Sequence, residues 1–586
     1  MIYYVCKYTP LELFAGFGEE CRILEEMPDN FDLSDRAAHA NLCGFGKSVI
    51  QAVLEGNIEN LVLVNCCDVM RRTYDILKSA GRCRFLYLLD LPHDDRTCEK
   101  ERFAESLLEL KNSFEDYSGM AFDRQAFLDS FRENPLPDKP YIGILGARVN
   151  RELEEFIRGK MNFETINLTC VRGRNLENAG AVQEKEALQE SGEDLFLSYA
   201  DILLSQMPCF RMNRTGARTR LFLDPKLRGI VYHTIKFCDY YGFEYASMDR
   251  DLAVPLLKIE TDFTRQSAGQ LSTRLEAFSE TLAAAENAEK EKITDQQERE
   301  CFKSGTQIRN RGKEEQQKMN QNHTFYAAGI DSGSATTDAV ILDQDRKIVS
   351  SVILATGGGA AESAEKCLAL AAEKAGISPA DISGTVATGY GRAYIGKNND
   401  TITEITCHAK GAHYLNPVVR TVIDIGGQDI KAIRIDENGA VKNFLMNDKC
   451  AAGTGRFLEL MARTLGLSLE EMGQKGLDWK ENIVISSMCT VFAESEVVSL
   501  VAQNKAVPDI IHGLNVSVAS KVSALASRLG DGPAYMMTGG VANNPGVVRE
   551  LEKKLGQPLY ICEESQLCGA LGAALFAAEK LEAEKS

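Results

Sequence analysis

The sequence lacks any run of 18 consecutive apolar residues, and it contains no Cys-x-x-Cys pair. The first absence argues against a transmembrane helix, which needs about 20 mostly apolar residues to cross a bilayer. The second removes the ligand spacing of ferredoxins and zinc ribbons, so any metal site must be assembled from distant cysteines. The N-terminus also lacks the basic start and longer apolar core of a signal peptide. We therefore expect a cytoplasmic protein with no membrane partner.

Basic residues are scarce relative to acidic ones, with 66 Lys and Arg against 84 Asp and Glu and a formal net charge of −18. Nucleic-acid binding draws mainly on clustered Lys and Arg, so we expect no nucleic-acid partner. By contrast, the chain is long and rich in cysteine. The 586 residues suffice for several lobes, and 17 cysteines are many for such a protein. In a reducing cytosol these are buried small hydrophobic residues or metal ligands rather than disulfides.

Residues 1–273 alternate short apolar runs with helical patterns. Runs with the length and composition of buried parallel strands lie at 61–64, 84–89, 141–145, 201–204 and 229–232. This pattern predicts a Rossmann-like, doubly wound α/β domain in two lobes that divide near residues 135–140. The carboxyl ends of the strands in such sheets border the ligand crevice. Cysteines that could converge there are Cys43, Cys66, Cys67, Cys209 and Cys238.

Residues 274–323 have a different composition, dominated by Glu, Lys, Gln, Asn and Ala, with few glycines and no apolar strand signals. We expect a charged, helical or partly flexible linker. Such a tether raises the local concentration of one domain at the other. The remaining residues, 324–586, form the second predicted domain.

A repeat organises this second domain. Residues 326–343 align without gaps on residues 419–436, so that Asp331 matches Asp424 and Gly333 matches Gly426. Each copy reads as a strand, an aspartate, a glycine turn, a second strand and a polar hairpin turn. The domain is therefore predicted to consist of two like halves that face each other.

The two hairpins have the residue types of a nucleotide site. Glycines let backbone N–H groups approach phosphate oxygens, hydroxyl side chains add donors, and paired aspartates can hold hydrated Mg²⁺ and the attacking water. The predicted catalytic residues are Asp331, Asp424 and Gln428. The predicted ATP-binding residues are Asp331, Ser332, Gly333, Ser334, Thr336, Gly426, Gly427, Gln428, Gly453, Thr454, Gly539, Gly540 and Asn543. This ordering resembles the acetate kinase, sugar kinase, Hsp70 and actin (ASKHA) superfamily of duplicated ATPase domains.

Within that superfamily, five segments resemble the activators of 2-hydroxyacyl-CoA dehydratases and the BadF/BcrA-type ATPases of benzoyl-CoA reductases. They are Val386–Arg392, Glu404–Gly411, Asp424–Asp429, Asn447–Arg456 and Ser487–Phe492. The resemblance covers nearly all of residues 325–580. It implies that Cys450 and Cys489 bind one [4Fe–4S] cluster shared across a homodimer. Both cysteines precede segments with helical apolar spacing, and a helix N-terminus lowers a thiol pKa and favours an anionic cluster.

In the first domain, the segments Asn41–Lys47, Asn65–Tyr74 and Tyr232–Asp239 resemble cysteine motifs of 2-hydroxyacyl-CoA dehydratase subunits and double-cubane cluster proteins. This resemblance implies a second iron–sulfur cluster with Cys43, Cys67 and Cys238 as ligands. Cys66 and Cys209 are surplus to a single [4Fe–4S] cubane and fit an [8Fe–9S] double cubane better, although no sixth ligand is unambiguous. The plain alternative is that these cysteines are buried packing residues.

Together, these features predict ATP-dependent electron transfer at low potential. A ferredoxin or flavodoxin would reduce the bridging cluster, and the electron would pass to the N-terminal cluster for reduction of a small molecule or dehydration of a 2-hydroxyacyl-CoA. A dehydratase resembles a heterodimer of two such subunits and this chain carries one, which favours the reductase. An alternative is a relay for a separate dehydratase or benzoyl-CoA reductase. A different class is an ASKHA kinase or chaperone-like ATPase with structural cysteines.

Overall fold

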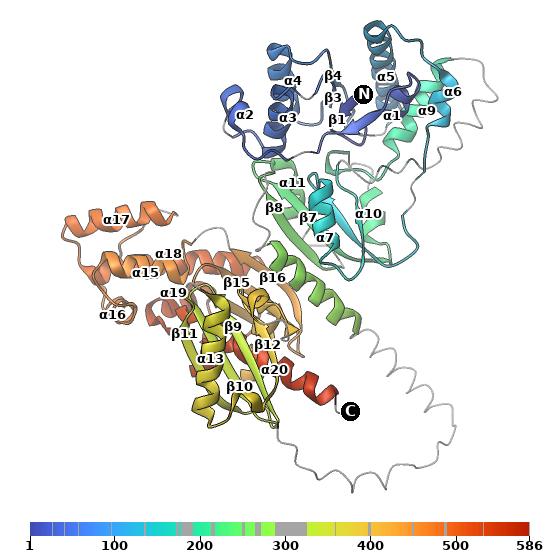
Figure 1. Cartoon of the computed structure of the whole chain (residues 1–586). Helices are drawn as coiled ribbons and strands as arrows, with labels where there is room; N and C mark the ends of the chain where they lie inside the picture. Colours follow the sequence, from blue (N-terminus) through green and yellow to red (C-terminus); the bar gives the residue numbers. More distant parts are fainter. Residues whose placement is uncertain are drawn as a thin grey trace, which may run out of the picture. The chain divides into compact units, whose positions relative to one another are not determined.

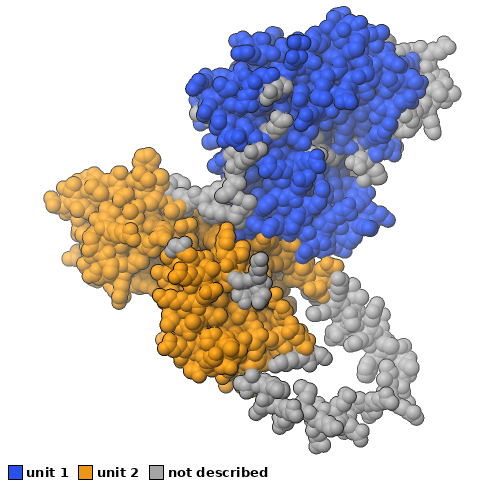
Figure 2. Space-filling view, in the orientation of Figure 1, with its two compact units in different colours: residues 1–275 blue, residues 276–586 orange. Residues whose placement is uncertain are grey.

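A computed structural model gives the fold. It describes residues 1–586 except 26, 40, 57, 95, 134–135, 171–173, 175, 177–191, 213–216, 249–251, 253, 264–270, 288–324, 358, 396–399, 448–450, 486–488, 531 and 585–586. Contacts divide the chain into two compact units, Met1–Leu275 and Glu276–Ser586 (Figures 1 and 2). In the described part of the chain, every helix is too short or too polar to cross a bilayer.

Unit 1 contains two four-stranded sheets in which all neighbouring strands are parallel. The first has the order β2-β1-β3-β4, with β1 Ile2–Tyr4, β2 Cys21–Ile23, β3 Asn60–Val64 and β4 Phe85–Leu89. The second has the order β6-β5-β7-β8, with β5 Tyr141–Gly146, β6 Glu164–Asn167, β7 Leu227–Ile235 and β8 Leu256–Thr261. The prediction of a two-lobed, Rossmann-like α/β domain is therefore confirmed.

The helices of unit 1 separate these strands in the chain (Figure 1). They are α1 Leu11–Ala15, α2 Asp32–Ala37, α3 Gly44–Leu54, α4 Asp68–Ala80, α5 Thr97–Ser118, α6 Arg124–Asp129, α7 Arg151–Arg158, α9 Gly192–Leu204, η1 Phe210–Met212, α10 Ala217–Phe222 and α11 Asp239–Met248.

One predicted strand of unit 1 is wrong, because residues 201–204 are the last turn of α9. Leu195, Tyr199 and Leu203 follow helical i, i+4 spacing and are buried in the core of the first lobe. Their neighbours Ile202 and Leu204 are buried as well. A helix buried on several sides reads as a short apolar run, and such a run cannot be told from a strand by periodicity.

Unit 2 contains two five-stranded sheets with the same strand order, β11-β10-β9-β12-β13 and β16-β15-β14-β17-β18. The first sheet comprises β9 Tyr326–Ser332, β10 Thr336–Leu342, β11 Ile348–Ala355, β12 Ile382–Thr388 and β13 Asp400–Thr401. The second comprises β14 Thr421–Ile425, β15 Ile430–Ile435, β16 Val441–Asn447, β17 Tyr535–Thr538 and β18 Leu559–Tyr560. In each sheet the first two strands form an antiparallel hairpin and a later strand adds in parallel. The predicted duplicated ASKHA-type domain is thus confirmed.

The helices of unit 2 are α13 Ala360–Ala375, α14 Glu404–Leu415, α15 Gly455–Thr464, α16 Leu469–Lys475, α17 Thr490–Ala502, α18 Val507–Ser527, α19 Pro545–Leu555 and α20 Cys568–Ala583, with short 3₁₀ turns η2 Pro379–Asp381, η3 Arg392–Tyr394, η4 Gly540–Asn543 and η5 Glu563–Ser565. A further helix spans residues 271–287. Its residue Glu280 accepts hydrogen bonds at 2.5 Å from the hydroxyls of Thr403 and Thr406, beside the start of α14.

Helices α14 and α20 pack backbone to backbone between the two sheets. A Cβ added at Gly411 of α14 would lie 2.2 Å from the carbonyl oxygen of Cys568, and one added at Gly572 of α20 would lie 1.8 Å from the carbonyl oxygen of Cys407. Each helix therefore places a glycine against a cysteine of the other. Cys407 and Cys568 are fully buried in this contact, which gives both a packing role.

Candidate nucleotide site and cysteine sets

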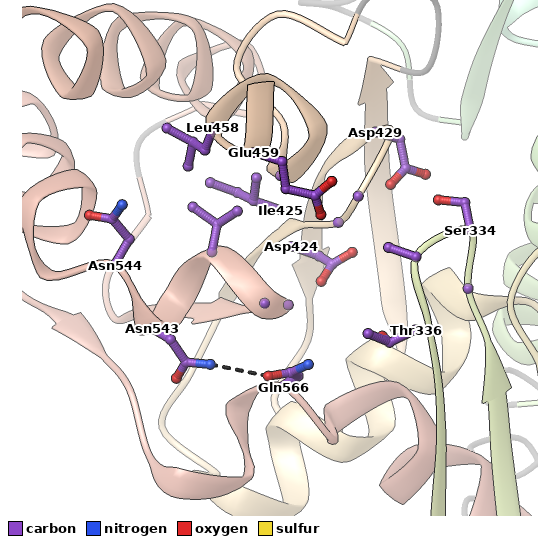
Figure 3. Close-up of a pocket in the computed structure, with 18 of the residues that line it drawn as sticks. Ser334, Thr336, Asp424, Ile425, Asp429, Leu458, Glu459, Asn543, Asn544 and Gln566 are labelled. Atoms are coloured by element: carbon purple, nitrogen blue, oxygen red, sulfur yellow. Dashed lines mark hydrogen bonds between the residues drawn. The ribbon is translucent and has the colours of Figure 1, made fainter. Parts of the chain in front are cut away.

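A cavity of about 630 Å³ lies between the two hairpins of unit 2, lined also by residues of α14, α15, α16 and η4. In Figure 3, Ser334 and Thr336 of the first hairpin lie on one side and Asn543 and Asn544 on the other. The Asn543 amide donates to the Gln566 side chain at 3.1 Å. The predicted residues that line the cavity are Asp331, Gly333, Ser334, Thr336, Asp424, Gly426, Gly427, Gly539, Gly540 and Asn543.

Four other predicted residues, Ser332, Gln428, Gly453 and Thr454, do not line the cavity. Gln428 is exposed, whereas Thr454 is fully buried and its hydroxyl donates to the Ala451 carbonyl at 2.6 Å. The start of α15 holds the glycine turn, because the Gly455 N–H donates to the Gly426 carbonyl at 2.9 Å. Direct ATP contacts by these four residues stay a prediction.

Lys431 is the main feature of the cavity that the sequence reading missed. Its side chain is 3% exposed, and its ammonium lies 2.8 Å from Asp429, 3.1 Å from Asp424 and 3.4 Å from Glu404. Burial acts to lower the pKa of Lys431, but these carboxylates outweigh it and raise the pKa above its ordinary value. The signal was present in the repeat, since Lys431 stands where the first copy has Asp338.

The first hairpin has two facing carboxylates and no lysine. Asp331 and Asp338 are paired across β9 and β10. Burial raises the pKa of Asp331 to about 7, and the charges of Asp338 and Asp424 add to the effect. Burial, with the charge of Asp424, also raises the pKa of Asp338 to about 7. Among the described residues, Asp338 Oδ1 is buried without a hydrogen-bond partner. These oxygen donors fit Mg²⁺, a hard cation that would remove the cost of ionising them.

Asp424 differs from its counterpart Asp331. Burial acts to raise the pKa of Asp424, but the neighbouring His408 and Lys431 outweigh burial and lower it. The Thr538 hydroxyl donates to Asp424 at 3.0 Å and lies 3.2 Å from His408 Nδ1. Burial lowers the pKa of His408. His408 thus stands between the aspartates, 3.8 Å from Asp331 and 3.7 Å from Asp424.

Gly569, in the first turn of α20, also borders the aspartates and was not predicted. A Cβ added there would lie 2.1 Å from Asp331 Oδ2 and 3.0 Å from His408 Nε2. Only a residue without a side chain leaves the Asp331 carboxylate in this position. No sequence motif marks Gly569, because its constraint comes from how α20 packs.

In unit 1, Cys43, Cys67 and Cys238 form one set of thiols at helix N-termini. Cys43 directly precedes α3, Cys67 precedes α4 and Cys238 precedes α11. Cys43 and Cys238 pack in one cluster of side chains. Burial, together with the charges of Cys43 and Cys67, raises the pKa of Cys238 to about 12, in keeping with three thiols near one another. Burial likewise raises the pKa of Cys43 to about 11, against N–H groups of the first turn of α3 that lower it.

A second set comprises Cys6, Cys66, Cys170 and Cys209. Burial raises the pKa of Cys6 to about 12, with the charges of Cys209 and Cys170 adding to it. A hydrogen bond with Cys67 is the main cause that raises the pKa of Cys66, and the charge of Cys6 contributes. The two sets therefore adjoin. Cys6 and Cys170 were missed in the sequence, although each follows a parallel strand, β1 and β6.

Backbone contacts tie the second set together. The Lys7 N–H donates to the Cys170 carbonyl at 3.2 Å. Arg211, two residues beyond Cys209, donates to the Asn65 carbonyl at 2.9 Å and so holds the loop of Cys209 beside Cys66.

The thiols of unit 1 fit an iron–sulfur cluster in the chemistry of their donors. They are largely buried and adjoin one another, and backbone N–H groups of three helix N-termini point at the first set. No three Cys, His, Asp or Glu side chains within the described ranges could hold a single metal ion. A cluster of several irons holds its thiolates farther apart than one ion does.

The two cysteines predicted for a bridging cluster lie in unit 2. Cys489 is exposed and directly precedes α17. Cys450 lies outside the described residues. The bridging cluster therefore stays a prediction.

Both halves of the chain match models of known protein families. Residues 328–577 match the model of the BadF/BadG/BcrA/BcrD ATPase family. The activator of lactoyl-CoA dehydratase from Anaerotignum propionicum is 49% identical over 44% of this chain and 98% of its own length. The chain belongs to the BadF/BadG/BcrA/BcrD ATPase family. Its N-terminal half matches the model of the 2-hydroxyglutaryl-CoA dehydratase D-component over residues 6–134 and 142–282. Both predicted resemblances are confirmed.

Two further matches come from Acidaminococcus fermentans. The (R)-2-hydroxyglutaryl-CoA dehydratase activating ATPase is 45% identical over 44% of this chain and 98% of its own length. The crystal structure of component A of that dehydratase is 44% identical, covers 44% of this chain and 99% of its own, and has a TM-score of 0.43.

Proposed function

We propose that this chain is an ATP-dependent, low-potential electron donor fused to its own iron–sulfur acceptor. The observation that carries the proposal is the convergence of two thiol sets in the unit that accompanies the ATPase. An ATPase alone has no use for seven adjoining cysteines in a neighbouring domain. The relatives of the ATPase half are named as activators of acyl-CoA dehydratases and as a benzoyl-CoA reductase subunit.

ATP would bind in the cavity between the hairpins. The glycine turns at Gly333 and Gly426 line the cavity and would meet the phosphates through backbone N–H groups, and the Asn543 loop borders the opposite side of the cavity. Asp331 and Asp424, with Asp338 facing Asp331, would hold hydrated Mg²⁺, which neutralises phosphate charge. Asp424, whose pKa is lowered by His408 and Lys431, is the carboxylate suited to orient the attacking water, and Gln428 would assist from the turn.

The bridging [4Fe–4S] cluster would be held by Cys450 and Cys489 of two copies of the chain. Its support is the exposure of Cys489 and of the apolar residues next to it in α17, Val491 and Phe492, which are 65% and 67% exposed. An exposed apolar face suits a second copy, and a two-fold axis would bring four thiolates together. A ferredoxin or flavodoxin would supply the electron.

In unit 1, Cys43, Cys67 and Cys238 would hold the accepting cluster. Cys66 and Cys209, with Cys6 and Cys170 beside them, supply enough thiols for an [8Fe–9S] double cubane, and this favours reduction of a small molecule as the outcome. A second candidate is a relay to a separate dehydratase or reductase, favoured by the names of the relatives. Helix-end dipoles at the first set would stabilise thiolate ligands in either case.

Iron counting on anaerobically purified protein tests the proposal. A bridging cubane shared by two copies adds two irons per chain, so we expect about six irons for a single N-terminal cubane and about ten for a double cubane. Cys489→Ala should remove two of them and leave ATP hydrolysis intact. Iron-free protein with full ATPase activity would instead support a kinase or chaperone-like ATPase.

A further inference from the structure

Two cations, Arg148 and Lys7, are buried in unit 1, and neither forms an ion pair with a carboxylate among the described residues. Each is 1% exposed. The Arg148 guanidinium lies over the Phe45 ring at 4.0 Å and donates through Nη1 to the Val5 carbonyl at 3.3 Å. Its Nε and Nη2 have no hydrogen-bond partner among the described residues. Burying such a charge is costly unless an anion meets it.

The backbone groups that contact these two residues lie next to thiols in the sequence. Val5, which accepts from Arg148, directly precedes Cys6, and the Lys7 N–H donates to the Cys170 carbonyl at 3.2 Å. The Lys7 ammonium donates at 2.6 Å to the carbonyl of Met207, two residues before Cys209. Both cations therefore lie at the second thiol set, Cys6, Cys66, Cys170 and Cys209.

The electrostatics agree with this placement. Burial lowers the pKa of Arg148 to about 10, and the groups that oppose burial are Cys170 first, then Glu25, Cys6 and Tyr4. Burial also lowers the pKa of Lys7, opposed by Cys209, Cys170 and Cys6 while Arg218 acts with burial. Arg218 itself is buried but forms an ion pair with Glu244. Arg148 and Lys7 are thus the buried cations whose counter-charge comes first from the second thiol set, with the Glu25 carboxylate contributing at Arg148.

We propose that Arg148 and Lys7 are positioning residues that balance the negative charge of a cluster ligated at the second thiol set and hold its reduction potential up. This inference rests on the proposed function, because it requires iron in unit 1. Net charge, hydrogen bonds and burial are the levers by which a protein sets the potential of a cluster. A buried cation stabilises the reduced, more negative form more than the oxidised form, so its removal should lower the potential.

The first test compares stability with and without iron. In iron-free protein the Arg148 charge is unpaired, so Arg148→Met should leave the melting temperature unchanged or raise it. In iron-loaded protein the same substitution should lower the melting temperature. A role in packing alone predicts destabilisation in both states, and a lower melting temperature of the iron-free variant overturns the proposal.

The second test measures the potential of the unit 1 cluster by a redox titration followed by electron paramagnetic resonance. The Cys489→Ala background removes the bridging signal. Arg148→Met and Lys7→Met should each shift the one-electron reduction equilibrium at least tenfold toward the oxidised form, about 59 mV. Arg148→Lys keeps the charge and should restore most of the potential. Arg158→Met, at an exposed residue of α7, is the matched control and should shift nothing.

The outcomes separate this inference from the proposed function. Wild-type protein without iron in unit 1 overturns both. Iron in unit 1 with an unshifted potential in Arg148→Met and Lys7→Met overturns the inference alone. If Arg148→Met fails to load iron while Arg148→Lys loads it, the charge is required for assembly and the proposal is supported. If both variants fail to load iron, the requirement is for the guanidinium shape and the proposal is wrong.

Discussion

Asp338 and Lys431 occupy equivalent positions in the two hairpins of unit 2. Asp338 is paired with Asp331 across β9 and β10, and Lys431 is paired with Asp424 across β14 and β15. The second half of the site therefore has an internal cation, whereas the first half has two facing carboxylates. This asymmetry fits the entry of Mg²⁺ on the side of Asp331.

Lys431→Met should abolish ATP hydrolysis and destabilise the protein. The substitution leaves Asp429, Asp424 and Glu404 buried without their shared cation, and breaking a buried ion pair costs about 3–5 kcal/mol. Urea unfolding and a phosphate-release assay measure the two effects. Lys442→Met, at an exposed lysine of β16, should change neither. Normal ATP hydrolysis by Lys431→Met would show that the ion pairs of Lys431 with these carboxylates are not needed for catalysis.

Asp338→Asn should flatten the pH dependence of stability in Mg²⁺-free buffer. The folded-state pKa of Asp338 is about 7 and lies above the ordinary aspartate value of 3.8. The contribution of Asp338 to the free energy of unfolding is fully present below about pH 4 and is lost as the pH rises through about 7. The free energy of unfolding then falls by up to about 1.4 kcal/mol per pH unit. Asp331 and Glu404, with pKa values raised by burial to about 7 and about 8, act with the same sign and remain in the variant.

Urea unfolding across that pH range measures the effect. The variant should be more stable than the wild type above about pH 7. A slope equal to that of the wild type would contradict the raised pKa of Asp338. Added Mg²⁺ should reduce the dependence in the wild type more than in the variant, because the ion competes with the protons.

Gly569→Ala should lower the ATPase rate on the order of 100-fold, because displacing a catalytic group by about 1 Å can cost that much. The added methyl would lie 2.1 Å from Asp331 Oδ2, so the carboxylate has to move. Steady-state hydrolysis measures the rate. Gly242→Ala, on α11 with open space around the glycine, is the control and should keep full activity. An unchanged rate in Gly569→Ala would remove Asp331 from the mechanism.

Cys43→Ala should remove iron from unit 1 and leave ATP hydrolysis unchanged. Cys43 is among the thiols at the N-termini of α3, α4 and α11. Cys83→Ala is the matched control, since the Cys83 thiol donates to the Ile58 carbonyl at 3.8 Å and belongs to neither thiol set. Iron per chain and absorption near about 400 nm measure the difference. Equal iron in the two variants would make Cys43 a packing residue.

The hairpins of unit 2 could be predicted from the sequence because their information is local. Alignment of Asp331 on Asp424 gives both turns, and the same alignment places Lys431 opposite Asp338. The replacement of an aspartate by a lysine at this position was visible in the sequence. The ion pairs that the lysine forms could not be inferred, because one partner, Glu404, comes from α14 and not from either hairpin. Contacts between distant elements leave no spacing pattern.

The missed cysteines of unit 1 show the same limit. Cys6 and Cys170 follow β1 and β6, short strands of three and four residues that produced no apolar run long enough to predict. The strand predicted at residues 201–204 was wrong for the opposite reason, because α9 is apolar on several sides and so produces an apolar run. The position of Cys209 beside Cys66 could not be predicted either, since Arg211 fixes it through backbone carbonyls.

The contact between α14 and α20 limits how unit 2 can move. The Gly411 and Gly572 backbones touch the facing carbonyls, so a lateral slide of either helix would force main-chain atoms into one another. Helix α14 lies against β14, β15 and β16, and α20 lies against β9, β10 and β12. We therefore expect any opening and closing of the two sheets to be a rotation about the crossing of α14 and α20. Glu404 and His408, on α14, would move with the second sheet, and Gly569, on α20, would move with the first.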